Sequence, residues 1–153
     1  MQPRREYPDH PFVGVGALLH RDGKVLLVRR KNEPNKGKWI IPGGLVELGE
    51  TLEVAVVREM KEELGIDSRV ERMLDVAGEI VYDEKKRVRY HYVLIDFLLT
   101  PIQDEVILND ESSAYQWFEP ENVRELETTA NTKKVVRRYL ELSALRSADH
   151  ELR

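Results

Sequence analysis

The chain of 153 residues has no cysteine. This absence excludes disulfide bonds, zinc sites built on thiolates and a cysteine nucleophile, and it gives no support for secretion. Long apolar runs are also missing, since no stretch approaches the roughly 18 apolar residues that a membrane-spanning helix requires. The N-terminal sequence MQPRREYPDHP has no apolar core of the length found in signal peptides. We therefore expect a cytoplasmic protein with no membrane partner.

An excess of positive charge is missing as well. The sequence has 24 Lys and Arg against 28 Asp and Glu, which gives a formal net charge of −4 at pH 7. This balance, with no long basic stripe, argues against a nucleic-acid partner. The length suits one domain with a hydrophobic core over residues 1–153, with an N-terminal arm over 1–10 and a polar C-terminal tail over 146–153.

The order of the predicted elements indicates an α/β (α+β) layered fold. Apolar and β-branched runs predict strands over 12–20, 25–30, 39–42, 69–82, 87–100 and 114–120. Helices are predicted over 51–64, with Thr51 as a possible cap and Gly65 as terminator, and over 131–145. Gly43-Gly44, between the strand predicted over 39–42 and the helix predicted over 51–64, gives the backbone freedom for a tight turn or for a close approach to a ligand.

The helix predicted over 51–64 has its carboxylates in an unusual place. At 100° per residue, Glu59, Glu62 and Glu63 form an arc that touches the apolar arc instead of standing opposite it. Carboxylates at the rim of a core are costly unless they are paired or coordinated, so a cationic partner is expected there. Clustered oxygen ligands without His or Cys suit hard cations such as Mg²⁺ or Mn²⁺.

The segment GLVELGETLEVAVVREMKEELGI, from Gly44 to Ile66, carries the strongest motif. Its Gly44, Glu50, Arg58-Glu59-Met60, Glu62-Glu63 and Gly65-Ile66 resemble the Nudix box at every fixed position, and the strand order extends the resemblance over most of the chain. The resemblance implies a Nudix fold, a mixed β-sheet packed between helices. It also implies metal-dependent hydrolysis of a nucleoside diphosphate linked to another moiety.

The resemblance also implies roles for single residues. The metal ligands would be the carbonyl of Gly43 and the carboxylates of Glu59, Glu62 and Glu63. Arg58 can pair with Glu62, four residues on, or with Glu50 across the loop-to-helix turn, and so orient the carboxylates that bind the metal. Taken alone, REMKEELG would equally suit an exposed helix with salt bridges.

A fourth acidic residue is often supplied in this family from outside the box. Here LNDESSAYQWFE offers Glu111, six residues before Trp117, with Asp110 as the second candidate. We take Glu111 as a candidate metal ligand or general base, a role for which Glu63 is the alternative. The other interpretation is a polar loop that carries ordinary charge.

Substrate contacts are predicted at several positions. Arg29 and Arg30 leave a strand before the box and could grip a phosphate in a bidentate way, or they could form a solvated strand end. Asn131 could contact a base or cap a helix. Tyr82 could stack on a base or pack within the sheet. Gly44 would allow a ligand to approach the backbone.

The segment RYHYVLIDFLL resembles the ADP-ribose pyrophosphatase branch of the family, although Tyr82 stands where members of that branch often have proline. ADP-ribose, cleaved to AMP and ribose 5-phosphate, is therefore the first expectation. The alternatives are a MutT-like nucleoside triphosphate pyrophosphohydrolase, a dinucleoside polyphosphate hydrolase, and a nucleotide sensor without turnover. A homodimer is also expected from the family. The late helix has apolar positions that could serve either the core or an interface, namely Val135, Val136, Tyr139, Leu140 and Leu142.

Overall fold

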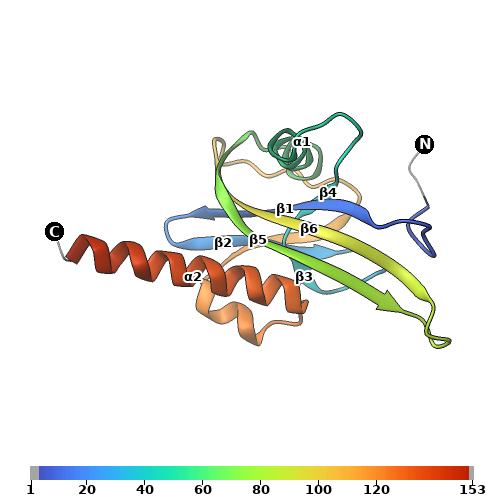
Figure 1. Cartoon of the computed structure of the whole chain (residues 1–153). Helices are drawn as coiled ribbons and strands as arrows, with labels where there is room; N and C mark the ends of the chain where they lie inside the picture. The colour runs from blue at the N-terminus through green and yellow to red at the C-terminus, as the bar shows by residue number, and fades with distance from the viewer. Residues whose placement is uncertain (1–3, 152–153) are drawn as a thin grey trace.

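The computed structural model describes residues 4–151 and contains a mixed sheet between two helices (Figure 1). The sheet has seven strands in the order β3-β2-β1-β6-β5, with β4 paired to β1 and β7 paired to β2. The elements are β1 Phe12–Arg21, β2 Lys24–Arg30, β3 Trp39–Ile40, β4 Gly43–Leu45, α1 Leu52–Leu64, β5 Ser68–Tyr82, β6 Val88–Pro101, β7 Ser112–Phe118, the 3-10 helix η1 Pro120–Glu125 and α2 Ala130–Glu151.

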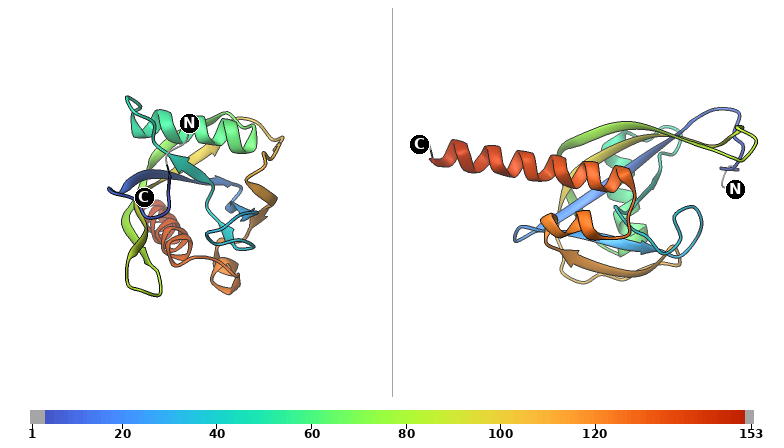
Figure 2. Two further views of the ribbon diagram at one scale, coloured as in Figure 1. Left: turned by 90° about the vertical axis from the view of Figure 1, so that its right-hand side faces the viewer. Right: turned by 90° about the horizontal axis from the view of Figure 1, so that it is seen from below.

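The sheet has a core on each side, one under each helix. Strands β1 and β6 run parallel at its centre, and the other strand pairs are antiparallel. Helices α1 and α2 lie on opposite sides of the sheet (Figures 1 and 2). The α1 side buries residues such as Val56, Met60 and Leu64, and the α2 side buries Val135 and Val136. The predicted fold class is confirmed.

Helix α1 begins and ends where its sequence predicts. The hydroxyl of Thr51 accepts a hydrogen bond from the Val54 N–H at 3.2 Å, which satisfies one free donor of the first turn. Gly65 follows the helix in the left-handed conformation, with φ 67°, and its N–H donates to the Lys61 carbonyl. Both ends of the helix are therefore fixed, and with them the direction of its acidic residues.

The Gly43-Gly44 segment is not a turn. It belongs to the short strand β4, which pairs antiparallel with β1 in the register Gly16↔Gly43 and Val15↔Gly44. A Cβ atom added at Gly43 would lie 2.0 Å from the carbonyl oxygen of Val15. The expected close approach is therefore made to the protein's own backbone, and it requires glycine.

The C-terminal helix is longer than predicted. Helix α2 runs to Glu151, so residues 146–151 of the predicted tail are helical, and residues 152–153 lie outside the described part. Thr129 caps it, since its hydroxyl accepts from the Thr132 N–H at 3.1 Å. The interpretation of Asn131 as a cap is therefore wrong. Of the core-or-interface positions, Val135, Val136 and Tyr139 are buried in the core.

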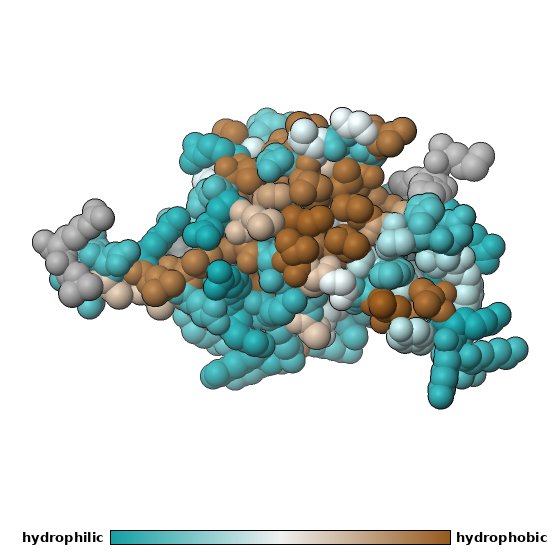
Figure 3. All heavy atoms as spheres, in the orientation of Figure 1, coloured by the Kyte–Doolittle hydropathy of each residue, from teal (hydrophilic) through white to brown (hydrophobic). Residues whose placement is uncertain are grey.

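The two remaining surfaces of interest are the N-terminal arm and the outer edge of β5. Tyr7 ties the arm to the β5–β6 hairpin, with its hydroxyl donating to Asp83 at 3.0 Å. Apolar side chains gather on the face shown in Figure 3, and Met73 and Val76 of β5 are each 52% exposed. These exposed apolar side chains of the edge strand β5 could take part in the expected homodimer. No helix within residues 4–151 is long and apolar enough to cross a membrane.

Candidate active site

Arg58 donates hydrogen bonds to three carboxylates at once. Its guanidinium donates to Glu50 through Nε at 2.5 Å and Nη2 at 2.8 Å, and through Nη1 to Glu59 at 2.9 Å and Glu62 at 3.2 Å. Nη2 also donates to the Leu45 carbonyl at 3.0 Å. These hydrogen bonds from Arg58 lower the pKa of Glu50 to about 2. The two pairings predicted for Arg58 are both present, so one cation orients the acidic face of α1.

Glu63 is the most buried carboxylate of this face. The residue is 4% exposed, and its Oε2 accepts a hydrogen bond from the Gly43 N–H at 3.1 Å. Burial raises its pKa to about 8, and the negative charges of Glu111 and Glu59 add to the effect. The hydrogen bond from Gly43 opposes the shift without cancelling it. Glu63 therefore carries a proton at neutral pH unless a cation lies beside it.

Glu59 lies against β4. Its side chain is 12% exposed, and a Cβ atom added at Gly44 would lie 2.3 Å from its carboxylate carbon. Burial raises the pKa of Glu59, the hydrogen bond from Arg58 lowers it, and the charges of Glu62 and Glu111 raise it further. The Glu59 carboxylate can lie here only because Gly44 has no side chain.

Glu111 completes the acidic group from another part of the chain. It lies exposed beside the start of β7, where its N–H donates to Asn109 Oδ1 at 3.0 Å and its carbonyl accepts from the Lys31 N–H at 3.1 Å. Its charge acts on both Glu59 and Glu63. Asp110, the other candidate, is the exposed residue before it. The fold therefore brings Glu111 into electrostatic range of the box carboxylates.

The chemistry of this group fits a hard divalent cation, although the carboxylates do not converge on one point. Within residues 4–151, no three Asp, Glu or His side chains are placed to hold a metal ion together. Arg58 draws Glu59 and Glu62 toward itself, while Glu63 turns to Gly43. All the donors are oxygens, and two buried carboxylates have raised pKa values. A bound divalent cation would offset the repulsion between these carboxylates.

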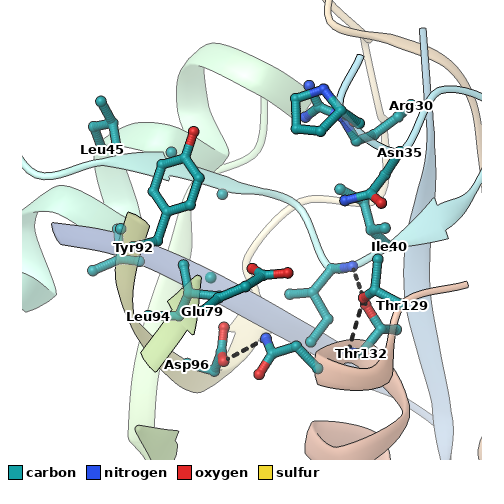
Figure 4. A pocket seen from close by; sticks show the side chains of 18 of the residues that line it. Arg30, Asn35, Ile40, Leu45, Glu79, Tyr92, Leu94, Asp96, Thr129 and Thr132 are labelled. Carbon is teal, nitrogen blue, oxygen red and sulfur yellow. Dashed lines mark hydrogen bonds between the residues drawn. The ribbon is translucent and has the colours of Figure 1, made fainter. Parts of the chain in front are cut away.

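A cavity of about 260 Å³ opens beside Glu63, the one carboxylate of this group that lines it. Glu63, Gly43 and Gly44 line one part of it, and Asp96 and Asn131 line another. Figure 4 shows side chains from several elements around it, with Arg30 and Asn35 across from Asp96 and Glu79. Its other walls are mainly apolar or aromatic, formed by Ile40, Leu45, Val81, Tyr90, Tyr92 and Leu94. The cavity therefore has both charged and apolar or aromatic lining residues, which suits a nucleotide.

Asp96 was not predicted from the sequence as a site residue. It is 3% exposed, and burial raises its pKa to about 6 against the opposing hydrogen bond from Asn131. The Nδ2 of Asn131 donates to Asp96 Oδ2 at 3.1 Å, as drawn in Figure 4. A single charged residue inside the apolar run YVLIDFLL was the available signal. Such a residue either pairs inside the fold or faces a ligand.

The two arginines and Tyr82, predicted as substrate contacts, lie in different surroundings. Arg30 lines the cavity and is held by the Pro34 carbonyl, which accepts from its Nε at 2.8 Å. Arg29 does not line the cavity, and its Nε donates to the Gly37 carbonyl at 3.0 Å. Tyr82 is 58% exposed at the end of β5 and does not line it either. The structure thus brings only Arg30 of the three to the cavity.

Replacing Gly44 tests how closely Glu59 must be held. In Gly44→Ala the new Cβ must push the Glu59 carboxylate aside, and we expect a loss in kcat of about 100-fold, as for a displacement of about 1 Å at a reacting centre. The matched control is Gly78→Ala, because a Cβ at Gly78 meets no atom within 4 Å. Steady-state kinetics of both variants provide the measurement. Equal activity of the two variants would contradict the tight placement of Glu59.

Glu63 should make the metal-free fold weaker as pH rises. Its pKa of about 8 in the folded state exceeds the ordinary 4.5, so the unfolded chain loses the proton first. Stability therefore falls between about pH 4.5 and pH 8. In chelator at pH 8, we expect Glu63→Gln to raise Tm by roughly 5–10 °C, corresponding to a few kcal/mol. At pH 4.5 the gain should vanish, which thermal melts at both pH values would check.

Glu62, the exposed residue next to Glu63, provides the control for the thermal melts of Glu63→Gln. The side chain of Glu62 is 55% exposed, and an exposed ion pair contributes well below about 1 kcal/mol. Glu62→Gln should therefore change Tm little at either pH. A Tm gain for Glu63→Gln that did not depend on pH would show that repacking, not charge, was responsible.

Comparison with known proteins extends these observations. Residues 10–139 match the family model of the NUDIX domain. An ADP-ribose pyrophosphatase of Methanocaldococcus jannaschii is 37% identical over 131 residues, covering 86% of this chain and 74% of that protein. A CTP pyrophosphohydrolase of Escherichia coli is 30% identical over 136 residues, covering 88% and 96%. The crystal structure of a MutT NUDIX hydrolase from Burkholderia pseudomallei superposes with a TM-score of 0.72 at 31% identity, covering 85% of this chain and 98% of that one.

Proposed function

The chain belongs to the NUDIX family and is a Nudix pyrophosphohydrolase, and on this premise we propose that it hydrolyses ADP-ribose to AMP and ribose 5-phosphate. The observation that carries the proposal is the cavity, whose lining includes Glu63 of the Nudix box and the Asp96–Asn131 pair. A substrate with a base at one end and a diphosphate beside the box would fill such a space. The similarity to the ADP-ribose pyrophosphatase supports this choice.

The metal of this reaction would be Mg²⁺ or Mn²⁺, since hard cations prefer oxygen ligands. We assign Glu59, Glu62, Glu63 and the Gly43 carbonyl to it, with Glu111 as a further ligand or as the base that takes the proton of the attacking water. When bound, the cation neutralises phosphate charge and activates the water. Arg58 keeps the carboxylates oriented through its hydrogen bonds.

The substrate would be held by residues on the cavity wall. Arg30 has its Nε fixed on the Pro34 carbonyl, and its Nη groups, which hydrogen-bond no residue within 4–151, would bind a phosphate in a bidentate way. Gly44 also lines the cavity, and its backbone would lie beside the diphosphate. Asn131 would contact the base. Hydrolysis would then add water across the anhydride, placing one phosphate on AMP and the other on ribose.

A second candidate is a nucleoside triphosphate pyrophosphohydrolase. The CTP pyrophosphohydrolase matches over 96% of its own length, and the same cavity would hold a triphosphate with its base at Asn131. The two reactions differ in their products. A triphosphate gives a monophosphate and pyrophosphate, whereas ADP-ribose gives two monophosphates.

Product analysis distinguishes these functions. The purified chain is given ADP-ribose, a diadenosine polyphosphate and an oxidised deoxyguanosine triphosphate separately, with Mg²⁺ or Mn²⁺. We expect AMP and ribose 5-phosphate from ADP-ribose as the fastest reaction. Faster release of pyrophosphate from the triphosphate would overturn the proposal in favour of the second candidate, and binding without any product would favour a sensor.

A further inference from the structure

The N-terminal arm brings a second arginine to the cavity, since Arg5 lines it together with Arg30 of β2. Tyr7 fixes the arm, because its N–H donates to the Arg89 carbonyl at 2.8 Å and its hydroxyl donates to Asp83 at 3.0 Å. The arm is therefore attached to the β5–β6 hairpin two residues after Arg5. This attachment holds Arg5 beside the cavity.

Arg5 and Arg30 lie near each other on the cavity wall. Both are partly buried, and both also line a hollow that adjoins the cavity, together with Pro34 and Tyr90. Burial raises the pKa of the Tyr92 hydroxyl, and the positive charges of Arg5 and Arg30 both oppose that rise. The two guanidinium groups therefore act on the same part of the wall.

Neither Arg5 nor Arg30 forms an ion pair with a carboxylate in the described part of the chain. Glu6, next to Arg5 in the sequence, pairs instead with Arg89 at 3.4 Å. Glu33 lines the adjoining hollow, but no ion pair joins it to either arginine. Like charges on a partly desolvated wall repel each other unless an anion lies between them. The two arginines thus form a place for an anion, and a phosphate matches their planar guanidinium groups well.

The position of Arg30 indicates which part of a substrate would meet this pair. Its charge acts on Glu63 of the Nudix box as well as on Tyr92. Figure 4 shows Arg30 across the cavity from Asp96. A substrate with its base at Asp96 and its diphosphate beside Glu63 would therefore direct its other end toward the two arginines.

We propose that Arg5 is a substrate-binding residue which, with Arg30, holds the second phosphate of the cleaved diphosphate, the one that departs with the leaving group. In ADP-ribose this is the phosphate that leaves as ribose 5-phosphate. Two guanidinium groups offer several N–H donors to its oxygens. This inference rests on the proposed function, since it takes the ligand to be a nucleotide whose diphosphate lies beside Glu63.

Binding of nucleotides that cannot be cleaved measures the contribution of the second phosphate. AMP has one phosphate, and α,β-methylene-ADP adds a second through a CH₂ group that water cannot hydrolyse. Calorimetric titrations of the full chain at pH 7 with Mg²⁺ give the ratio of the two affinities for wild type and for Arg5→Met. In Arg5→Met we expect this ratio to fall about tenfold, because only the second phosphate loses hydrogen bonds to a charged group. The affinity for AMP should stay within about twofold of wild type, which also shows that the variant is folded.

Arg4→Met is the matched control, because Arg4 belongs to the same arm and carries the same charge but does not line the cavity. It should keep the wild-type ratio. The proposal would be overturned by an unchanged ratio in Arg5→Met, by the same fall in Arg4→Met, or by no gain from the second phosphate in wild type. An equal loss of affinity for both nucleotides in Arg5→Met would also overturn it, since the arm would then only shape the cavity. A fall confined to Arg5→Met, in a chain that does not cleave ADP-ribose, would support the role of Arg5 and overturn the proposed function alone.

Discussion

Glu59→Gln is expected to lower kcat by about 10³-fold or more while the fold survives, because it removes one charge from the proposed metal ligands. The carboxylate that it replaces lies 12% exposed between Arg58 and Gly44. Glutamine has nearly the same shape and keeps an oxygen that can accept from Arg58 Nη1. The change is therefore one of charge, and circular dichroism should show an intact fold.

Metal binding gives this prediction a readout that does not depend on turnover. A ligand that binds only the folded state raises Tm in proportion to the logarithm of its concentration above Kd. Wild type should gain Tm as Mg²⁺ or Mn²⁺ is added, and Glu59→Gln should gain clearly less at equal concentration. Glu53→Gln is the matched control, because Glu53 lies on the same helix and is exposed. Turnover of Glu59→Gln within a few-fold of wild type would refute the assignment of Glu59.

The acidic face of α1 was predictable because its cause is local. One helical turn repeats every 3.6 residues, so sequence spacing alone places Glu59 and Glu63 beside the buried Met60. The caps Thr51 and Gly65 are equally local signals. The pairing of Arg58 with Glu50 spans only eight positions, from the residue before the Thr51 cap to the second turn of α1. Each of these predictions depended on residues that all lie within the segment from Gly44 to Ile66.

The cavity wall was less predictable because distant segments build it. Asp96 and Asn131 are 35 residues apart and meet only because α2 packs against the sheet. The choice between Arg29 and Arg30 depended on which side chain reaches the cavity, and the pairing of β2 with β7 is irregular between these two residues, so regular alternation could not decide it. Both arginines follow a run of four buried residues, Val25 to Val28, that shows no alternation. The sequence could therefore indicate a cation at this strand end but not which arginine reaches the substrate.

Arg58→Met should lower Tm by roughly 6–12 °C in metal-free buffer at pH 7, which corresponds to about 3 kcal/mol for a chain of this size. The side chains of Glu50 and Glu59 are each 12% exposed, and both depend on Arg58 for a cationic partner. Removing one member of a partly buried ion-pair network is costly because the desolvated charges that remain have no compensation. Methionine keeps the apolar stem, so the loss reports on charge and hydrogen bonding.

Two comparisons separate the Tm effect of the Arg58 ion-pair network from the effect of removing an ordinary surface charge. Arg138→Met breaks an exposed pair with Glu141, whose side chains are 47% and 55% exposed, and it should cost less than about 1 kcal/mol. Adding Glu50→Gln to Arg58→Met should recover part of the lost Tm, because it removes one of the unpartnered charges. A Tm for Arg58→Met close to that of Arg138→Met would contradict the role of Arg58.

The pH dependence of the Arg58→Met effect follows from Glu50. Hydrogen bonds from Arg58 hold the pKa of Glu50 at about 2, below its ordinary 4.5. The pairing therefore stabilises the fold fully above pH 4.5, and this contribution is lost as pH falls toward 2. The difference in Tm between wild type and Arg58→Met should narrow over that range, which parallel melts at pH 7, 4 and 3 would measure. A constant difference would mean that Arg58 stabilises the fold through the Leu45 carbonyl and packing, not through Glu50.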